Sequence, residues 1–434
     1  MVIVISLLIE IITGMIILHP NEVNEPFSLI CVSINTLLIF FLIFKTYKKY
    51  STVLILAYFL RLFLLFADYY KLFPIIHSGA DTEAFHAIAV YNAKNGLIIM
   101  RLTNYSTIVS IFYFIIGPQR LFVQYINLLC GMGSIFFIIK TLDLLKVEKN
   151  TKILFVSIAC FLPHFIIFSS IFLRESLIIF ATAVSVYFYI RWFLSGKITV
   201  FILSCLFVLL AVWLHSGMIG CLLGYLIGYS LYDRKSKNLK FNINSIIPIG
   251  IGCILLVFLI SSGYFTEYFN GLLDSESEID FLAGRFNHQS EGGSKYLTWI
   301  SVENPLQMIL FSPLKMFYFL FSPIPLDWRG INDVIGFCFS SFFLIYLTWI
   351  SFTNLKYVKD KIEKNLVKIL LISSFITIFI YGLGVFASGT AMRHRTKIIS
   401  ILIITAAISY NSTNKNKKRK INYFLNNEKN ISNI

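Results

Sequence analysis

The sequence predicts an all-α polytopic membrane protein with about twelve transmembrane helices and two partial membrane insertions. Of its 434 residues, 57% are hydrophobic and only 14% are charged, whereas a soluble domain is about 25% charged. Many apolar runs approach the roughly 20 residues that cross a bilayer core. The basic residues fall in short segments between these runs, the distribution that orients helices in a membrane.

The distribution of Lys and Arg also predicts the orientation of the chain. The run Lys45–Tyr50 (KTYKKY) and the segments Lys140–Lys152 and Asp233–Lys240 are basic, so we expect them to face the cytoplasm. The first apolar run, Val2–Leu18, has no basic residue before it and no small-residue cleavage site, so we expect a retained helix rather than a signal peptide. Both termini are then predicted to be cytoplasmic.

The predicted spans alternate across the membrane between these segments. They are Val2–Leu18, Ser28–Phe44, Ser51–Ala67, Leu121–Ile139, Ile153–Phe168, Ser176–Phe193, Thr199–Leu214, Met218–Tyr232, Ile243–Ser262, Val334–Ser351, Ile369–Ala387 and Ile398–Tyr410.

Two apolar runs are expected to insert only partly. Tyr105–Gly117 is too short for a full span, and Leu306–Ser322 contains Pro313 and Lys315. We therefore expect one integral-membrane domain over residues 1–410, with external loops 68–120 and 263–332. Residues 411–434 form a basic cytoplasmic tail that is expected to lack regular structure.

Composition also argues against several other classes of site. The seven cysteines lie in apolar segments and form no CxxC pair, so we expect neither a disulfide framework nor a zinc site. The net charge of +15 includes the run Lys415–Lys420 (KNKKRK). We interpret that run as a tail that fixes orientation or contacts anionic lipid, and we expect no nucleic-acid partner.

The predicted topology brings many ionisable residues to the outer face of the membrane, several of them at helix ends. They are Asp81, Glu83, His86, Arg174, Glu175, His215, Arg285, Arg329, Arg393, His394 and Arg395. Arginine binds phosphate through paired N–H groups and stays charged. A carboxylate or an imidazole can take the proton of an attacking hydroxyl. Together these groups suit transfer of a group from a phosphorylated leaving group.

Each candidate also has a structural interpretation that the sequence leaves open. Arg174 and Glu175 can form an ion pair where a helix starts, and His215 can hydrogen-bond a neighbour at a helix end. Asp81 precedes the helical pattern AFHAIAVYNA and can cap that helix. The run Arg393–Arg395 can extend its side chains to the membrane interface.

The stretch LRESLIIF…RWFLSGK…WLHSGMIG (Leu173–Gly220) resembles the EpsG-like and Wzy-type polymerases of bacterial surface polysaccharides. In those proteins a helix opens with an Arg-Glu or Arg-Gln pair, and the next span ends in a His followed by a small residue. The segment SGADTEAFHAIA (Ser78–Ala89) is similar to the acidic first external loop of GT-C-type glycosyltransferases. AMRHRTKIISILIITAA (Ala391–Ala407) resembles the R-x-R entry to a late helix in such proteins.

The resemblance implies a glycosyltransferase in the bacterial cytoplasmic membrane that joins oligosaccharide repeats carried on polyprenyl pyrophosphate, without a cofactor. Asp81 or His215 would activate the acceptor hydroxyl. The residues expected to bind pyrophosphate or glycan are Arg174, Glu175, Arg285, Arg393, Arg395 and His86. Membrane lipid, a flippase and a chain-length regulator would be partners. No metal site is expected, although the resemblance leaves Asp81 open as a ligand.

Three other functions fit the same sequence. A flippase or transporter of the lipid-linked glycan would carry polar residues deep along a pathway and usually shows internal repeats. An acyltransferase that modifies the glycan could use a buried histidine. A scaffold of an export complex would tolerate substitution of the polar clusters.

Overall fold

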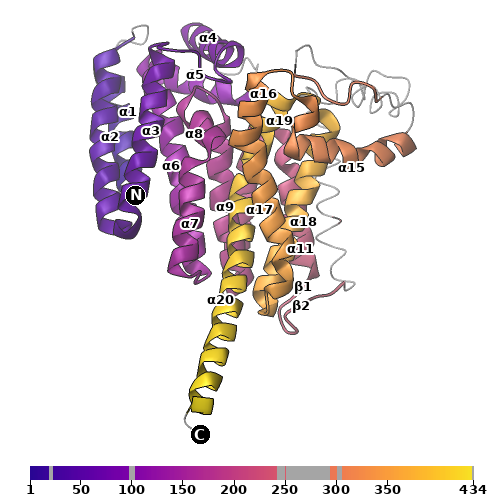
Figure 1. Ribbon diagram of the computed structural model, residues 1–434. Helices are drawn as coiled ribbons and strands as arrows, with labels where there is room; N and C mark the ends of the chain where they lie inside the picture. The colour runs from indigo at the N-terminus through magenta and orange to yellow at the C-terminus, as the bar shows by residue number, and fades with distance from the viewer. Residues whose placement is uncertain (19–22, 97–102, 242–249, 251–293, 301–304, 433–434) are drawn as a thin grey trace. The chain divides into compact units, whose positions relative to one another are not determined.

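The computed structural model describes residues 1–18, 23–96, 103–241, 250, 294–300 and 305–432 (Figure 1). The expected all-α class is confirmed: apart from one two-stranded hairpin, the regular elements of these residues are helices. Six of their helices are long and apolar enough to cross a membrane, or seven if one bent pair is a single span. The expected span Ile243–Ser262 and the candidate Arg285 lie outside the described residues.

The helices fall into two compact units, and the expected single integral-membrane domain over residues 1–410 stays a prediction. Unit 1 comprises residues 1–136 and 157–181, and unit 2 comprises residues 137–156 and 182–434. Helices α6, α7 and α9 each contribute residues to both units.

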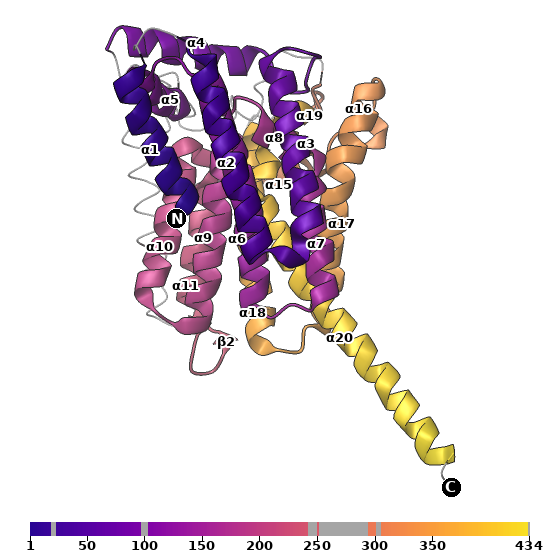
Figure 2. The same cartoon turned by 90° about the vertical axis from the view of Figure 1, so that its left-hand side faces the viewer.

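Unit 1 contains most of the N-terminal helices. They are α1 (Val2–Ile17), α2 (Glu25–Thr46), α3 (Ser51–Tyr69), α4 (Ala80–Lys94), α5 (Asn104–Ile116), the first part of α6 (Arg120–Leu144), the end of α7 (Lys149–Phe161), α8 (Pro163–Ser170) and the start of α9 (Glu175–Ser195). In both views α2 lies beside α1 and α3, and α4 lies crosswise at one end of them (Figures 1 and 2).

Besides the other parts of α6, α7 and α9, unit 2 contains the remaining helices and the hairpin. They are α10 (Ile198–Leu214), α11 (Ile219–Leu231), β1 (Tyr232–Asp233), β2 (Asn238–Leu239), α15 (Pro305–Phe321), α16 (Ile331–Gly336), a π-helical turn (Phe337–Ser341), α17 (Phe342–Thr353), α18 (Lys361–Gly384), α19 (Ser388–Arg395) and α20 (Ile399–Ser432). Helix α11 packs along α18, and α17 packs along α20.

Most predicted spans coincide with helices, but several helices are short. Val2–Ile17, Asn104–Ile116 and Ile198–Leu214 are apolar helices of 16, 13 and 17 residues, fewer than the roughly 20 residues that usually cross a bilayer core. The count of twelve spans therefore stays a prediction. Helix α20 continues through residues 411–432, where no regular structure was expected, because no Gly or Pro interrupts it after Ile399.

The expected span Ile153–Phe168 is broken at its proline. Helix α7 ends at Phe161, α8 begins at Pro163, and the two axes differ by 50°. Proline has no N–H to donate and its ring clashes with the preceding turn, so it ends one helix and starts the next.

Candidate functional site

In unit 1 the connection between α8 and α9 is buried. Ser169, Phe172 and Glu175, in or next to this connection, are all 0% exposed. That Ser169–Glu175 lies on the outer side of the membrane stays a prediction. Helix α9 begins at Glu175, where the helix dipole favours its negative charge. Irregular backbone can lie inside an apolar protein only if other groups satisfy its carbonyls.

Polar side chains of α6 supply those hydrogen bonds, and Arg61 of α3 bonds atoms of α7 and α8. Nδ2 of Asn127 donates to the carbonyls of Ile171 and Leu173, at 3.2 and 2.9 Å. Nε2 of Gln124 donates to the carbonyl of Ser170 at 2.7 Å. Arg61 donates to Ser169 Oγ from Nε and to the Cys160 carbonyl from Nη1, each at 2.9 Å. Arg61, a buried arginine in a span, therefore has a structural role.

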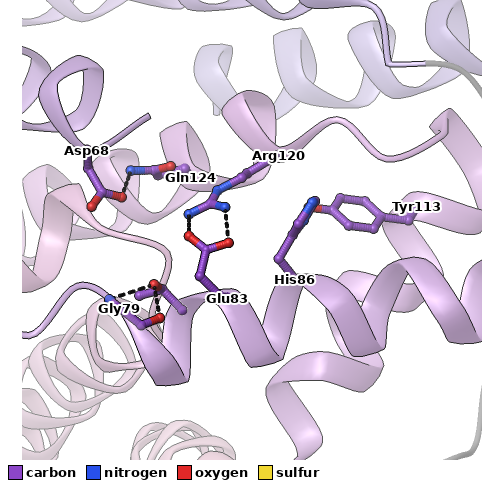
Figure 3. Close-up of polar contacts among 8 residues, drawn as sticks. Asp68, Gly79, Glu83, His86, Tyr113, Arg120 and Gln124 are labelled. Carbon is purple, nitrogen blue, oxygen red and sulfur yellow. Dashed lines mark hydrogen bonds and ion pairs between the residues drawn. The ribbon is translucent and has the colours of Figure 1, made fainter. Parts of the chain in front are cut away.

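A second set of interacting side chains in unit 1 lies beside helix α4, and we call it the α4 cluster (Figure 3). The Arg120 guanidinium donates to both carboxylate oxygens of Glu83, at 2.9 and 3.0 Å, and lies 5.6 Å from the ring centre of Phe172. His86 Nδ1 lies 2.8 Å from the Tyr113 hydroxyl. The α4 cluster thus comprises Glu83, His86, Tyr113, Arg120 and Phe172.

Electrostatics within the α4 cluster follow from this packing. The hydrogen bonds from Arg120 lower the pKa of Glu83, since they stabilise the carboxylate. Burial, aided by the charge of Arg120, lowers the pKa of His86 to about 4, so its imidazole is neutral at pH 7. A neutral imidazole brings no positive charge to a pyrophosphate, which weakens the expected role of His86 in holding it.

Asp81 does not cap α4. The N-cap is Gly79, whose φ of +146° is a conformation that side chains rarely adopt. The backbone N–H of Gly79 donates to Thr82 Oγ1 at 3.0 Å, and Thr82 Oγ1 donates back to the Gly79 carbonyl at 2.9 Å. Asp81 lies exposed in the first turn of α4, where it is accessible from outside unit 1.

In unit 2, His215 is the centre of what we call the imidazole cluster. It follows the last residue of α10 and is 4% exposed. Its Nδ1 lies 3.0 Å from the hydroxyl of Tyr381 in α18. Its ring centre is 4.6 Å from that of His394 in α19. Lys397 completes the cluster: its Nζ lies 2.9 Å from His394 Nδ1 and 5.4 Å from the Tyr381 ring centre.

A glycine makes room for this arrangement. A Cβ atom on Gly217 would lie only 2.5 Å from Cε1 of Tyr381, closer than non-bonded carbon atoms approach. The small residue after His215 therefore lets the Tyr381 ring reach the imidazole. The sequence placed His215 at this helix end, but not Tyr381, because nothing distinguishes one of 23 tyrosines inside an apolar run.

Arg395 corrects the prediction that it holds pyrophosphate. It is 0% exposed, and its guanidinium donates to the carbonyls of Leu320 and Ser322 and to the hydroxyls of Ser340 and Ser341. These partners use all five of its N–H groups. Arg395 therefore joins the end of α15 to the π-helical turn before α17 and has no donor left for an anion.

The remaining predicted residues are divided between the units. Asp81, His86, Arg174 and Glu175 belong to unit 1, and His215, Arg393 and Arg395 belong to unit 2. Arg393 lies partly exposed in the last turn of α19. The sequence missed Tyr381 and Lys397. The only signal for Lys397 was its position three residues after His394, which puts both side chains on one face of a helical turn.

Comparison of the chain with protein-family models, with curated proteins and with solved structures finds no match.

Proposed function

We propose that this chain is an integral-membrane glycosyltransferase that joins oligosaccharide repeat units carried on polyprenyl pyrophosphate at the outer face of the bacterial cytoplasmic membrane. The observation that carries the proposal is the imidazole cluster. It combines two imidazoles, an ammonium and a phenol at the ends of apolar helices. A buried imidazole can move a proton, and a nearby cation can stabilise a phosphate leaving group.

The proposed reaction needs one proton transfer and one leaving group. The hydroxyl oxygen of the acceptor repeat attacks the anomeric carbon of the donor and forms the glycosidic bond. The bond from that carbon to the pyrophosphate oxygen breaks, and polyprenyl pyrophosphate departs with the electron pair. The hydroxyl proton passes to the imidazole of His215. Tyr381, in contact with Nδ1, sets the orientation and the tautomer of that ring.

One cation of this stretch is suited to the leaving group. Arg393 is partly exposed and precedes His394 in the chain, so its guanidinium would bind the pyrophosphate. Lys397 is 0% exposed and contacts His394, so its charge would act through the imidazole cluster rather than by direct contact. The roles predicted for Arg174, Arg285 and Asp81 stay predictions from the sequence, because Arg174 and Asp81 belong to unit 1 and Arg285 lies outside the described residues.

The test is to replace His215 by Ala and measure the amount and the length of the polymer that cells make. We expect a loss of polymer of about 100-fold or more, the usual contribution of a general base. Tyr381→Phe should lower activity less and shift its pH profile, because it removes the hydroxyl partner of Nδ1 but keeps the ring. With purified protein, release of polyprenyl pyrophosphate from a lipid-linked repeat should fall in parallel.

His164→Ala is the matched control, since it removes another buried imidazole, which lies in unit 1. Membrane abundance must be equal in all variants. Full-length polymer from a normally inserted His215→Ala protein would contradict the proposal.

A flippase or transporter of the lipid-linked glycan is the second candidate, and the broken helix of unit 1 favours it. The 50° bend at Pro163 and the buried α8–α9 connection resemble the interrupted helices that line transporter sites. The two functions leave different products when the chain is deleted. Loss of a flippase leaves lipid-linked repeats on the cytoplasmic side, whereas loss of the polymerase leaves single repeats on the outer side.

A further inference from the structure

The imidazole cluster contains two histidines, and the contact with Lys397 separates their chemistry. The ammonium group of a lysine has three N–H donors and no acceptor. The Nζ of Lys397 lies 2.9 Å from Nδ1 of His394, so an ammonium there must donate and the ring nitrogen must accept. A nitrogen that accepts carries no proton. The neutral imidazole of His394 then has its proton on the other nitrogen, Nε2.

Two contacts of Lys397 favour the charged form of its amine. The lone pair of His394 Nδ1 attracts a cation, and so does the face of the Tyr381 ring, whose centre lies 5.4 Å from Nζ. An uncharged amine would instead accept a hydrogen bond from Nδ1. The two arrangements put the proton of His394 on different nitrogens, so they can be told apart by experiment.

The local backbone brings the amine of Lys397 to the His394 ring. His394 lies in the last turn of α19, and Lys397 lies in the 3₁₀ turn Thr396–Ile398 that follows it. Side chains three residues apart eclipse each other in a 3₁₀ turn. Arg395, between the two residues in sequence, is held by the hydrogen bonds of its five N–H groups, so this turn is fixed in place.

His215 differs from His394, because its partner can either donate or accept. Nδ1 of His215 lies 3.0 Å from the hydroxyl of Tyr381, and a phenol oxygen serves in both ways. The form with the proton on Nδ1 is therefore open to His215. In that form its Nε2 keeps a lone pair and can take the proton of an attacking hydroxyl.

We propose that Lys397 is a positioning residue, which holds His394 in the tautomer with its proton on Nε2 and so makes that ring a hydrogen-bond donor, while His215 stays the base. The catalytic part rests on the proposed function: the N–H of His394 donates to the pyrophosphate oxygen that receives the electron pair of the breaking bond. His394 is 9% exposed, against 4% for His215 and 0% for Lys397, so it is the most accessible of the three to a ligand.

The tautomer is measured by ¹⁵N NMR of the full chain in detergent, labelled at the imidazole nitrogens. His394→Gln identifies the His394 signals among those of seven histidines. At pH 7 we expect the proton on Nε2 and an Nδ1 signal typical of a hydrogen-bonded acceptor. In Lys397→Met, which has a similar length but no donor, that signal should shift and the Nδ1–H form should appear. Lys397→Arg should keep the wild-type tautomer, because a guanidinium also has only donors.

Lys315→Met is the matched control. Lys315 is another buried lysine of unit 2, and its Nζ lies 3.5 Å from the Leu383 carbonyl. Its substitution should leave the His394 signals unchanged. A proton on Nδ1 of His394 in the wild type overturns the proposal, since the lysine would then be the acceptor, and this measurement needs no variant of Lys397. Unchanged His394 signals in a folded Lys397→Met protein overturn it as well.

Activity tests the catalytic part separately. Release of polyprenyl pyrophosphate should fall at least about tenfold in Lys397→Met, because an imidazole in the wrong tautomer is a poor catalyst, and Lys397→Arg should restore most of it. Unchanged release from a Lys397→Met protein with an altered tautomer would refute this part. If His215→Ala still makes full-length polymer, the proposed function fails, whereas the tautomer found by NMR stands.

Discussion

At the scale of single residues, the pKa values of two side chains of helix α4, Glu83 and His86, are both lowered. Arg120 lowers the pKa of Glu83 by hydrogen bonding, and burial lowers that of His86 from 6.5 to about 4. When a folded-state pKa lies below the unfolded one, the unfolded chain binds more protons at intermediate pH. The stability that these groups contribute is therefore fully present near neutral pH and is lost as the pH falls.

We predict that the protein in detergent unfolds at a lower temperature at pH 5 than at pH 7. At pH 5 His86 is protonated in the unfolded chain but not in the folded chain. Proton binding therefore stabilises the unfolded state relative to the folded state. In His86→Gln the part of this decrease in unfolding temperature that comes from His86 should disappear, because glutamine does not titrate. Thermal unfolding of both proteins at a series of pH values checks the prediction. An equal loss in wild type and variant would show that another group is responsible.

At the scale of elements, the α8–α9 connection depends on one amide. Asn127 satisfies the carbonyls of Ile171 and Leu173 and also donates to the Tyr105 hydroxyl. Asn127→Leu leaves two buried carbonyls without this donor, so we expect a loss of about 2 kcal/mol or more in the free energy of unfolding. Chemical unfolding in detergent measures it.

The matched control for that substitution is Asn95→Leu. Asn95 is exposed at the end of α4, and its amide donates to the Tyr91 carbonyl in its own helix. Its substitution should change the free energy of unfolding by less than about 0.5 kcal/mol. If both leucine variants were equally stable, the connection would not depend on Asn127.

Helix positions could be predicted from the sequence because long apolar runs have few alternatives in a membrane. The ends Phe168 and Ser176, expected around the α8–α9 connection, lie within two residues of Ser170 and Glu175. The environment of that connection could not be predicted in this way, since its burial depends on Gln124 and Asn127 of another helix. The same applies to Arg395, whose hydrogen-bond partners come from segments 54 to 75 residues away.

At the scale of the whole molecule, the sequence makes a definite prediction of topology. Asp81 is expected outside and Ser236 in the cytoplasm, because the basic segments Lys140–Lys152 and Asp233–Lys240 prefer the cytoplasmic side. Asp81→Cys and Ser236→Cys, each in a chain without its native cysteines, should react with an impermeant maleimide from opposite sides. Labelling of both from the same side would mean that Asn104–Ile116 crosses the membrane.

The candidate site was harder to predict than the helices. His215 stood out because ionisable groups are rare in apolar sequence. Its partner Tyr381 did not, because a tyrosine in an apolar span carries no such signal. Arg395 stood out for the same reason as His215, yet its role is structural. Sequence alone identifies a buried charge, but only its neighbours reveal whether protein or ligand neutralises it.

The contacts of Arg395 also constrain the order in which the chain assembles. An arginine at the centre of a bilayer costs about 2.5–3.5 kcal/mol when it enters by itself. Its partners at the end of α15 and in the π-helical turn precede it in the chain and leave the ribosome first. The α19–α20 segment can therefore enter a membrane that already contains α15 and α17. The guanidinium of Arg395 then replaces its hydrogen bonds to water by hydrogen bonds to the carbonyls and hydroxyls of those segments. During biosynthesis, burial of this residue would complete the C-terminal half of the protein.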